Sequence, residues 1–217
     1  MVPAGMRSII RDWIKKDYID VLVTTGANLT HDVAEALGHH HLQGKSDVSD
    51  EELHERGVDR IYDVFMKNEV YEDMEDFVQT LELPERVSVK QALWRIGEAL
   101  DDPESILTTA ARKKVPIFCP GFVDCGLSVQ LALNHDKLTL DYYEDLRELV
   151  NIAWDASPAG FVVIGGGVPK NHIMQALQFT PNQASFAVQV TTDTPSPGGL
   201  SGAELREGIS WGKVNPK

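Results

Sequence analysis

The chain has 217 residues and a formal net charge of −13 at pH 7, which argues against nucleic acid as a direct ligand, because phosphate groups are bound by Lys and Arg. An acidic surface of this kind could attract a cationic substrate or a basic partner. Hydrophobic residues make up 42% of the chain, no apolar run approaches the roughly 20 residues that span a bilayer, and the start shows no signal peptide, so we expect a cytoplasmic protein with one domain over residues 1–217.

The N-terminal half of the chain alternates between helical and extended patterns. Apolar residues recur at helical spacing over residues 8–16, and a β-branched run over residues 18–24 predicts a strand. A Thr/Gly turn follows, and Thr30 is expected to cap a helix over residues 32–37. Residues 38–60 are polar and predict a loop. The next predicted helices cover residues 62–81, 88–100 with a Ser88-x-x-Gln91 capping box, and 104–113.

The C-terminal half continues this alternation. The predicted strands cover residues 115–119, 161–164 and 184–191, and the predicted helices cover residues 142–156 and 172–178. A long loop is expected over residues 192–202, which are rich in Pro, Gly, Ser and Thr. The whole pattern predicts an α/β fold with a doubly wound, mainly parallel, Rossmann-like sheet and helices on both faces.

The cysteines and the histidine run give no signal for a metal site. Cys119 and Cys125 are the two cysteines of the chain, and their spacing fits no zinc-ribbon pattern, so we expect buried free thiols. The run from His39 to His41 is not expected to bind a metal, because the side chains of adjacent residues point in different directions.

A lysine near the C-terminus has the neighbours of a candidate nucleophile. Lys213 ends the tetrapeptide Ser210-Trp-Gly-Lys213. A lysine amine attacks carbon only when it is unprotonated, and the ordinary lysine pKa of about 10.4 must be lowered to allow this at neutral pH. The indole of Trp211 could supply desolvation, and Gly212 lets the backbone bend.

A triple-glycine turn follows the strand predicted at residues 161–164. The sequence Gly165-Gly-Gly-Val-Pro-Lys170 would let a ligand approach the backbone closely, at the start of a helix. The ends of other predicted strands, near Thr25, Asp124 and Thr192, are further candidates for ligand binding, because α/β sheets bind ligands at such ends.

Together, the glycine turn and the Ser-Trp-Gly-Lys motif resemble the deoxyhypusine synthase family. The resemblance covers nearly all of the chain and implies a tetrameric enzyme with active sites between subunits. Such an enzyme uses NAD to move the 4-aminobutyl group of spermidine, through a covalent imine on Lys213, to a lysine of the hypusine-carrying translation factor. It also implies that the chain lacks both ends of a full-length synthase.

The resemblance further assigns roles to individual residues. For NAD it implies the residues Thr25, Gly26, Ala27, Asp124, Gly165, Gly166, Gly167, Thr192 and Asp193. For the amine it implies Glu207 and Trp211, together with His31 and Asn171, which stand where the family has an acid and a histidine. Lys213 is the expected catalytic nucleophile, and His172 is the expected proton carrier.

The amine pocket departs from the family pattern, which leaves several functions open. Positions expected to be acidic are occupied by His31, Val129, Pro197 and Leu200. A changed donor, such as agmatine or another polyamine, is one consequence. Transfer to a free amine, as in homospermidine synthesis, is a second possibility. A non-catalytic paralogue that binds NAD and supports an active partner is the third.

Overall fold

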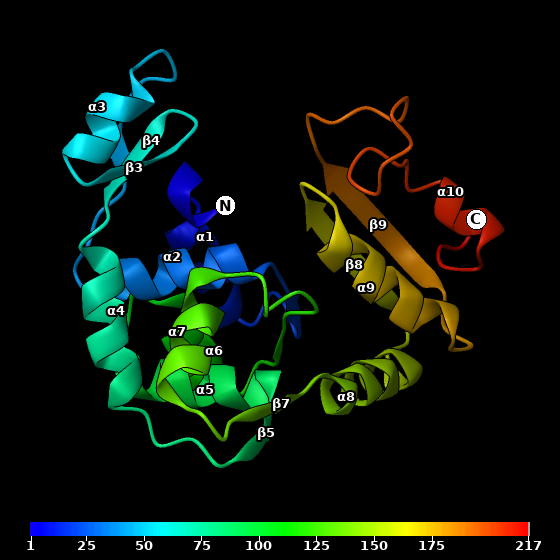
Figure 1. Cartoon of the computed structure of the whole chain (residues 1–217). Coiled ribbons are helices and arrows are strands. Elements are labelled where there is room, and N and C mark those ends of the chain that lie inside the picture. The colour runs from blue at the N-terminus through cyan, green and yellow to red at the C-terminus, as the bar shows by residue number, and fades with distance from the viewer. Residues whose placement is uncertain (217) are drawn as a thin grey trace. The chain divides into compact units, whose positions relative to one another are not determined.

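The computed structural model describes residues 1–216 as a mixed α/β protein, which confirms the predicted fold class. The chain divides into two compact units (Figure 1). Unit 1 contains residues 1–22, 26–117 and 122–140. Unit 2 contains residues 23–25, 118–121 and the chain from residue 141 onward.

Unit 1 is mainly helical. Its helices are η1 (Val2–Ala4), α1 (Arg7–Lys15), α2 (Gly26–Ala36), α3 (Asp50–Glu55), α4 (Val70–Gln79), α5 (Val89–Leu100), α6 (Ile106–Lys113) and α7 (Gly126–Asn134). Its strands are β2 (Leu42–Gln43), β3 (Val58–Ile61), β4 (Val64–Lys67) and β5 (Arg86–Ser88), and β5 pairs with β7 (Thr139–Asp141).

The core of unit 1 depends on a close crossing of α5 and α6. Leu93, Ile96 and Leu107 are fully buried there. A Cβ on Gly97 would lie 2.3 Å from the carbonyl oxygen of Leu107, so only glycine permits this approach. The Thr108 hydroxyl donates to the Gly97 carbonyl at 2.7 Å and ties the two helices together.

A buried carboxylate joins three further segments of unit 1. Asp32 of α2 is 0% exposed and accepts hydrogen bonds from Arg7 Nε at 2.7 Å, Ser105 Oγ at 2.8 Å and the backbone amides of Ile106 and Leu107 at 3.0 and 2.9 Å. These amides begin α6 and have no partners within that helix. Asp32 therefore caps α6 from outside and connects it to α1 and α2.

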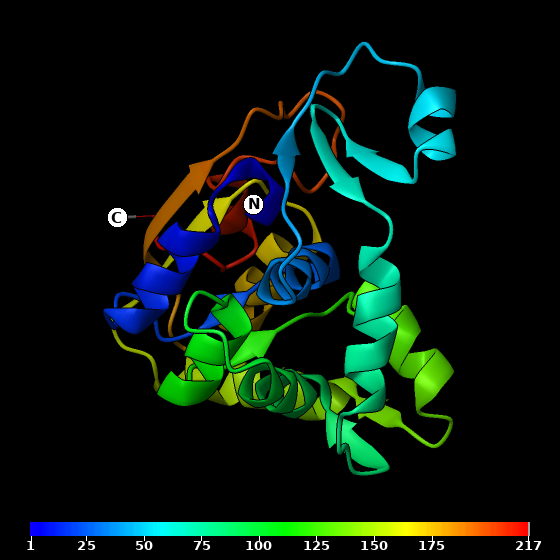
Figure 2. The ribbon, with the colours of Figure 1, turned by 90° about the vertical axis from the view of Figure 1, so that its left-hand side faces the viewer.

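A small antiparallel sheet stands beyond the N-terminal end of α4 in both views (Figures 1 and 2). Its strand order is β2-β4-β3, and α3 accompanies it. Two sequence predictions are wrong here: residues 38–60 contain β2, α3 and β3 rather than only a loop, and residues 64–67 form a strand rather than part of a helix.

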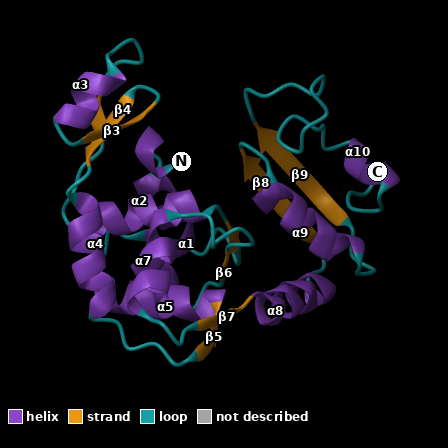
Figure 3. Cartoon of the chain, viewed as in Figure 1, coloured by secondary structure: helices purple, strands orange, loops and turns teal. Residues whose placement is uncertain are grey.

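Unit 2 is built on a parallel strand pair. Its elements are α8 (Tyr142–Asp155), β8 (Ala159–Ile164), α9 (Val168–Gln178), β9 (Ala184–Val190) and α10 (Glu207–Ser210). The register pairs Phe161 with Ala187 and Ile164 with Val190, so both strands end at one edge. Figure 3 shows α9 alongside this pair. The side chains of Val162, Phe186 and Val188 remain exposed.

A second pair of strands, β1 (Leu22–Val23) and β6 (Ile117–Phe118), is also parallel. The amide of Leu22 in β1 donates to the Pro116 carbonyl at 3.0 Å, and the amide of Thr24 donates to the Phe118 carbonyl at 3.0 Å, next to β6. The two strands therefore run parallel to each other. Among residues 1–216 the strands form four short sheets of two or three strands.

Several helix boundaries differ from those predicted. Helix α2 begins at Gly26, so Thr30 lies inside it and does not cap it. Helix α9 begins at Val168, four residues before the predicted start, and α7 and α10 were not predicted at all. The Ser88 cap is confirmed, since its hydroxyl accepts from the Gln91 amide at 3.2 Å. None of the helices in the described chain is long and apolar enough to span a bilayer.

Candidate functional site

The backbone around Lys213 is fixed by the start of β9. The amide of Ala184 donates to the Lys213 carbonyl at 3.2 Å, and the amide of Asn215 donates to the Ala184 carbonyl at 2.9 Å. Val214 thereby forms a parallel bridge with Ala184. Gly212 has a φ of 69°, a conformation that favours glycine, and this turn brings the chain from α10 into the bridge.

The ammonium of Lys213 lies between an amide and an indole. Its Nζ is 3.4 Å from Oδ1 of Asn171 and 5.4 Å from the ring centroid of Trp211. A cation–π contact of this length holds the ammonium over the ring. Trp211 is 62% exposed, so the indole shields one side of the amine and does not enclose it.

The triple-glycine turn is open on one side and covered on the other. Gly165 and Gly167 have φ values of 87° and 75°, and a Cβ added to Gly165 would meet nothing within 4 Å. In contrast, a Cβ on Gly166 would lie 2.5 Å from Cα of Ser201. Gly166 is therefore needed for packing against the loop, whereas Gly165 leaves space for a ligand.

A buried lysine connects the loop around Ser201, between β9 and α10, to the glycine turn by hydrogen bonds. Lys170 of α9 is 5% exposed and donates to Gln189 Oε1 at 3.0 Å, to the Leu200 carbonyl at 3.3 Å and to the Ala203 carbonyl. Gln189 in turn donates at 2.9 Å to the carbonyls of both Gly165 and Ser201. We call this pair the Lys170–Gln189 clasp. Burial lowers the pKa of Lys170, and the charge of Glu207 opposes that shift.

Further predicted residues of unit 2 lie on α9 and just after β9. Thr192 and Asp193 are exposed just after β9, at the edge where β8 also ends. His172 is half-buried on α9, and burial lowers its pKa. Asn171 also donates to Gln175 at 3.1 Å. Lys213, Asn171 and Trp211 are thus brought together within unit 2.

The predicted residues of unit 1 lie on α2 and just before α7. A Cβ on Gly26 would lie 2.7 Å from Sγ of Cys125, so Gly26 is a packing residue, and Asp124 is its exposed neighbour next to that cysteine. Ala27 is exposed, as is Thr25, which precedes Gly26 in the chain and belongs to unit 2. His31 is half-buried on α2 and hydrogen-bonded to His41.

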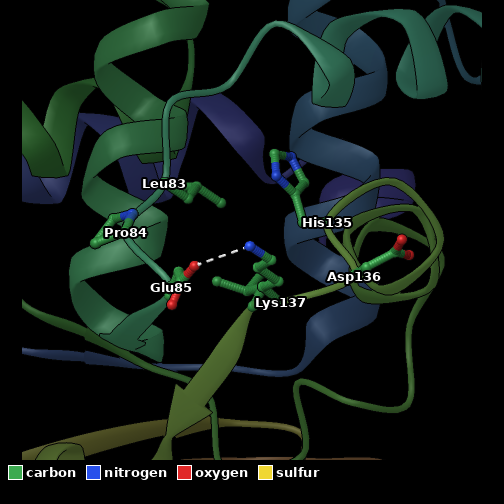
Figure 4. Close-up of a pocket in the computed structure, with 7 residues that line it drawn as sticks. Leu83, Pro84, Glu85, His135, Asp136 and Lys137 are labelled. Atoms are coloured by element: carbon green, nitrogen blue, oxygen red, sulfur yellow. Dashed lines mark ion pairs between the residues drawn. The ribbon is translucent and has the colours of Figure 1, made fainter.

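Unit 1 also contains a small pocket (Figure 4). It has a volume of about 200 Å³ and is lined by the segments 83–85 and 135–138. The Lys137 ammonium lies 3.5 Å from the Glu85 carboxylate, and both side chains are exposed. An exposed ion pair of this kind contributes little to binding or stability. None of the predicted site residues lines this pocket.

Both cysteines are free thiols, as predicted, but only Cys119 is buried, whereas Cys125 is half-buried. Within residues 1–216 no group of three His, Cys, Asp or Glu side chains is arranged to hold a metal ion. The sequence reasoning missed the role of Gln189. One signal was available, since Gln189 is the single amide side chain in β9, whose other residues are apolar except Ser185.

Comparison with known proteins places the whole chain in one family. The deoxyhypusine synthase profile matches residues 1–217. The chain is 48% identical to a Methanosarcina mazei protein named "Probable deoxyhypusine synthase 1", over 99% of this chain and 69% of that protein. It is 40% identical to "Probable deoxyhypusine synthase 2" of Archaeoglobus fulgidus, over 100% of this chain and 76% of that protein.

The fold has a match among solved structures. A crystal structure of an Entamoeba histolytica protein assigned as a deoxyhypusine synthase superposes with a TM-score of 0.62 at 23% identity, over 99% of this chain and 71% of that one. At that identity the likeness concerns the fold alone. Because the family profile spans residues 1–217 and the archaeal relatives are matched over most of their length, the chain belongs to the deoxyhypusine synthase family.

Proposed function

We propose that this chain is an NAD-dependent transferase that moves the 4-aminobutyl group of spermidine, or of a related amine, to a lysine of the hypusine-carrying translation factor. Membership of the deoxyhypusine synthase family supports aminobutyl transfer. The observation that carries the proposal is the position of Lys213, whose Nζ lies against Trp211 and within 3.4 Å of Asn171 Oδ1.

The residues proposed to hold NAD have the features that a dinucleotide requires. The turn at Gly165 has open space beside its backbone, and Asp193 is an exposed carboxylate at the same strand edge. Backbone amides at a helix start suit phosphate groups, and a carboxylate suits ribose hydroxyls. The further proposed contacts are Thr25, Gly26, Ala27, Asp124, Gly166, Gly167 and Thr192. When bound, NAD would accept a hydride from the donor amine and return it at the end of the reaction.

Lys213 is proposed to carry the transferred group. Its neutral amine attacks the oxidised carbon of the donor, the bond from that carbon to the leaving diamine breaks, and an imine to Nζ remains. The acceptor lysine then displaces Nζ in the same way. The Asn171 amide oxygen accepts a hydrogen bond from the ammonium and so directs Nζ before reaction.

The remaining roles follow from charge and protonation. Glu207 is an exposed carboxylate on α10, six residues before Lys213 in the sequence, and can pair with an ammonium of the amine. Burial lowers the pKa of His172, which favours the neutral imidazole, the form that can accept a proton. His31 is proposed to contact the amine. We further propose that the enzyme is a homotetramer, which light scattering of the purified protein tests.

Trapping the covalent intermediate tests the proposal directly. The full-length protein is incubated with NAD and spermidine, putrescine or agmatine in turn, NADH is followed by absorbance, and borohydride is added before mass analysis. We expect amine-dependent NADH and an aminobutyl adduct on Lys213 with spermidine. Lys213→Arg should abolish the adduct, and Lys137→Arg, at an exposed lysine, should not.

The same experiment separates the alternatives. Formation of homospermidine from added putrescine, in competition with the translation factor, would favour the free-amine acceptor. NAD binding with neither NADH nor an adduct, for every amine, would contradict the covalent scheme and favour a non-catalytic paralogue.

A further inference from the structure

Three side chains of unit 1 form a continuous hydrogen-bonded network, of which the proposal above uses only His31, as a contact to the amine. His31 and Glu35 are four residues apart on α2, so their side chains project from the same face. His41, from the segment after α2, lies between them. Its Nδ1 is 2.7 Å from Glu35 Oε1, and its Nε2 is 2.9 Å from His31 Nδ1.

The His41 ring, in the middle of this hydrogen-bonded network, is largely shielded from water. The His41 side chain is 6% exposed and the Glu35 side chain 23% exposed. The two imidazole rings meet edge to face, with centroids 4.8 Å apart and an interplanar angle of 70°. A hydrogen bond in such a setting is stronger than in water, so its direction is well determined.

Counting protons fixes the tautomers when both rings are neutral. A carboxylate can only accept, so the proton shared with Glu35 belongs to His41 Nδ1. His41 Nε2 then carries a lone pair, and the proton between the rings belongs to His31 Nδ1. The outer nitrogen of His31, Nε2, is therefore left as an acceptor. Among residues 1–216 it has no hydrogen-bond partner, and it is not sealed from solvent.

We propose that Glu35, His41 and His31 form a proton relay whose outer end, Nε2 of His31, accepts a proton from a substrate ammonium. As that proton arrives at Nε2, the Nδ1 proton of His31 passes to Nε2 of His41. The positive charge then rests on His41 beside the Glu35 carboxylate, and His31 stays neutral. No proton is gained or lost within the relay beyond the one taken from the amine.

The charges around His31 suit this direction of transfer. Burial lowers the pKa of His31 to about 4, with further lowering by His41 and the Met1 amino group, while Glu35 acts in the opposite sense. Arg7 Nε lies 3.6 Å from Glu35 Oε2, so the carboxylate at the far end of the relay also pairs with a guanidinium. The low pKa keeps His31 neutral at neutral pH, with Nε2 as a hydrogen-bond acceptor, but it disfavours a charge on His31 itself. The relay therefore has to pass that charge to His41, beside the Glu35 carboxylate.

This inference rests on the proposed function only in taking the proton donor to be an amine. Glu35 and His41 are positioning residues, since neither reaches the outer end of the relay. A carboxylate at position 31 would bind an ammonium by charge, whereas His31 can also remove its proton. An amine must be neutral before it can attack or be oxidised at the adjacent carbon, so proton removal serves the transfer.

Nitrogen NMR of the full chain with ¹⁵N-labelled histidine tests the relay without measuring activity. At pH 7.5 we expect His31 with Nδ1 protonated and Nε2 unprotonated. His41→Leu should reverse this preference, because the acceptor for Nδ1 is lost. His41→Gln should restore it, because the amide oxygen can accept in its place. His40→Leu, at the exposed neighbour, is the matched control and should change nothing.

Spermidine added to the same samples tests the outer end. We expect the His31 Nε2 signal to move, and Glu35→Gln to weaken spermidine binding about tenfold, the effect of a lost charge-assisted interaction. A wild-type His31 protonated on Nε2, a tautomer unaffected by His41→Leu, or an Nε2 signal unmoved by spermidine would each overturn the relay. The histidine NMR signals do not depend on the Lys213 adduct. The covalent scheme at Lys213 can therefore fail while the relay stands, and the relay can fail while the covalent scheme stands.

Discussion

Replacing the buried Asp32 with Asn should destabilise unit 1 by about 3–5 kcal/mol, the cost of removing one partner from a buried ion pair. Asn keeps the size of the side chain but turns one of its two oxygens into a donor. Both carboxylate oxygens accept from two groups each, so the new NH₂ faces donors whichever way the amide turns. The guanidinium of Arg7, 12% exposed, then has Asp102 and Glu35 as its remaining acidic partners.

Urea unfolding and amide hydrogen exchange check this together. The midpoint should fall with an unchanged slope, and the amides that begin α6 should lose protection first, because Asp32 is their cap. Asp73→Asn is the matched control: its carboxylate is 58% exposed and pairs with one histidine, so we expect a change below about 1 kcal/mol. A loss below about 1 kcal/mol for Asp32→Asn, or unchanged protection in α6, would refute the reasoning.

Three other substitutions follow from the structure. Gly97→Ala should cost about 2 kcal/mol in chemical denaturation, because the new methyl meets the backbone carbonyl of Leu107, whereas Gly121→Ala, with open space around it, should be neutral. Lys170→Met should speed proteolytic cleavage in the loop between β9 and α10, since three acceptors lose their donor; equal cleavage rates would show that the loop is held otherwise. Burial lowers the pKa of His31 to about 4, so the folded protein takes up the His31 proton at a lower pH than the unfolded chain does. The free energy of unfolding should therefore fall as the pH drops from about 6.5 towards 4. His31→Gln should remove about 1 kcal/mol of the loss between pH 7 and 5, a figure reduced for the partial exposure of the ring, and identical pH profiles would contradict this.

Elements with strong local signals were predicted well. The helix at residues 142–155 was identified from its apolar stripe, and the cap at Ser88 from its box pattern. The hairpin of β3 and β4 was missed because its two-residue turn, Tyr62-Asp63, contains no glycine, although Tyr62 adopts a φ of 57°. Turn residues of that kind give no sequence signal for a hairpin.

The motifs of the candidate site could be recognised in the sequence, whereas the contacts between its side chains could not be predicted from it. The Ser-Trp-Gly-Lys sequence alone places an indole near Lys213. The hydrogen bond to Asn171 depends on the bridge between Val214 and Ala184, which joins segments thirty residues apart. Likewise, helical spacing pairs His31 with Glu35, but His41 reaches them through a loop whose path no local pattern specifies.

The Lys170–Gln189 clasp has a consequence for how this chain can change over time. One lysine and one glutamine, nineteen residues apart, satisfy the carbonyls of the glycine turn and of the loop before α10. A substitution at either position alone leaves buried acceptors without donors, while a joint replacement by residues that pack together need not. Positions 170 and 189 should therefore vary as a pair among descendants of this sequence, and a directed-evolution library that randomises one should randomise both.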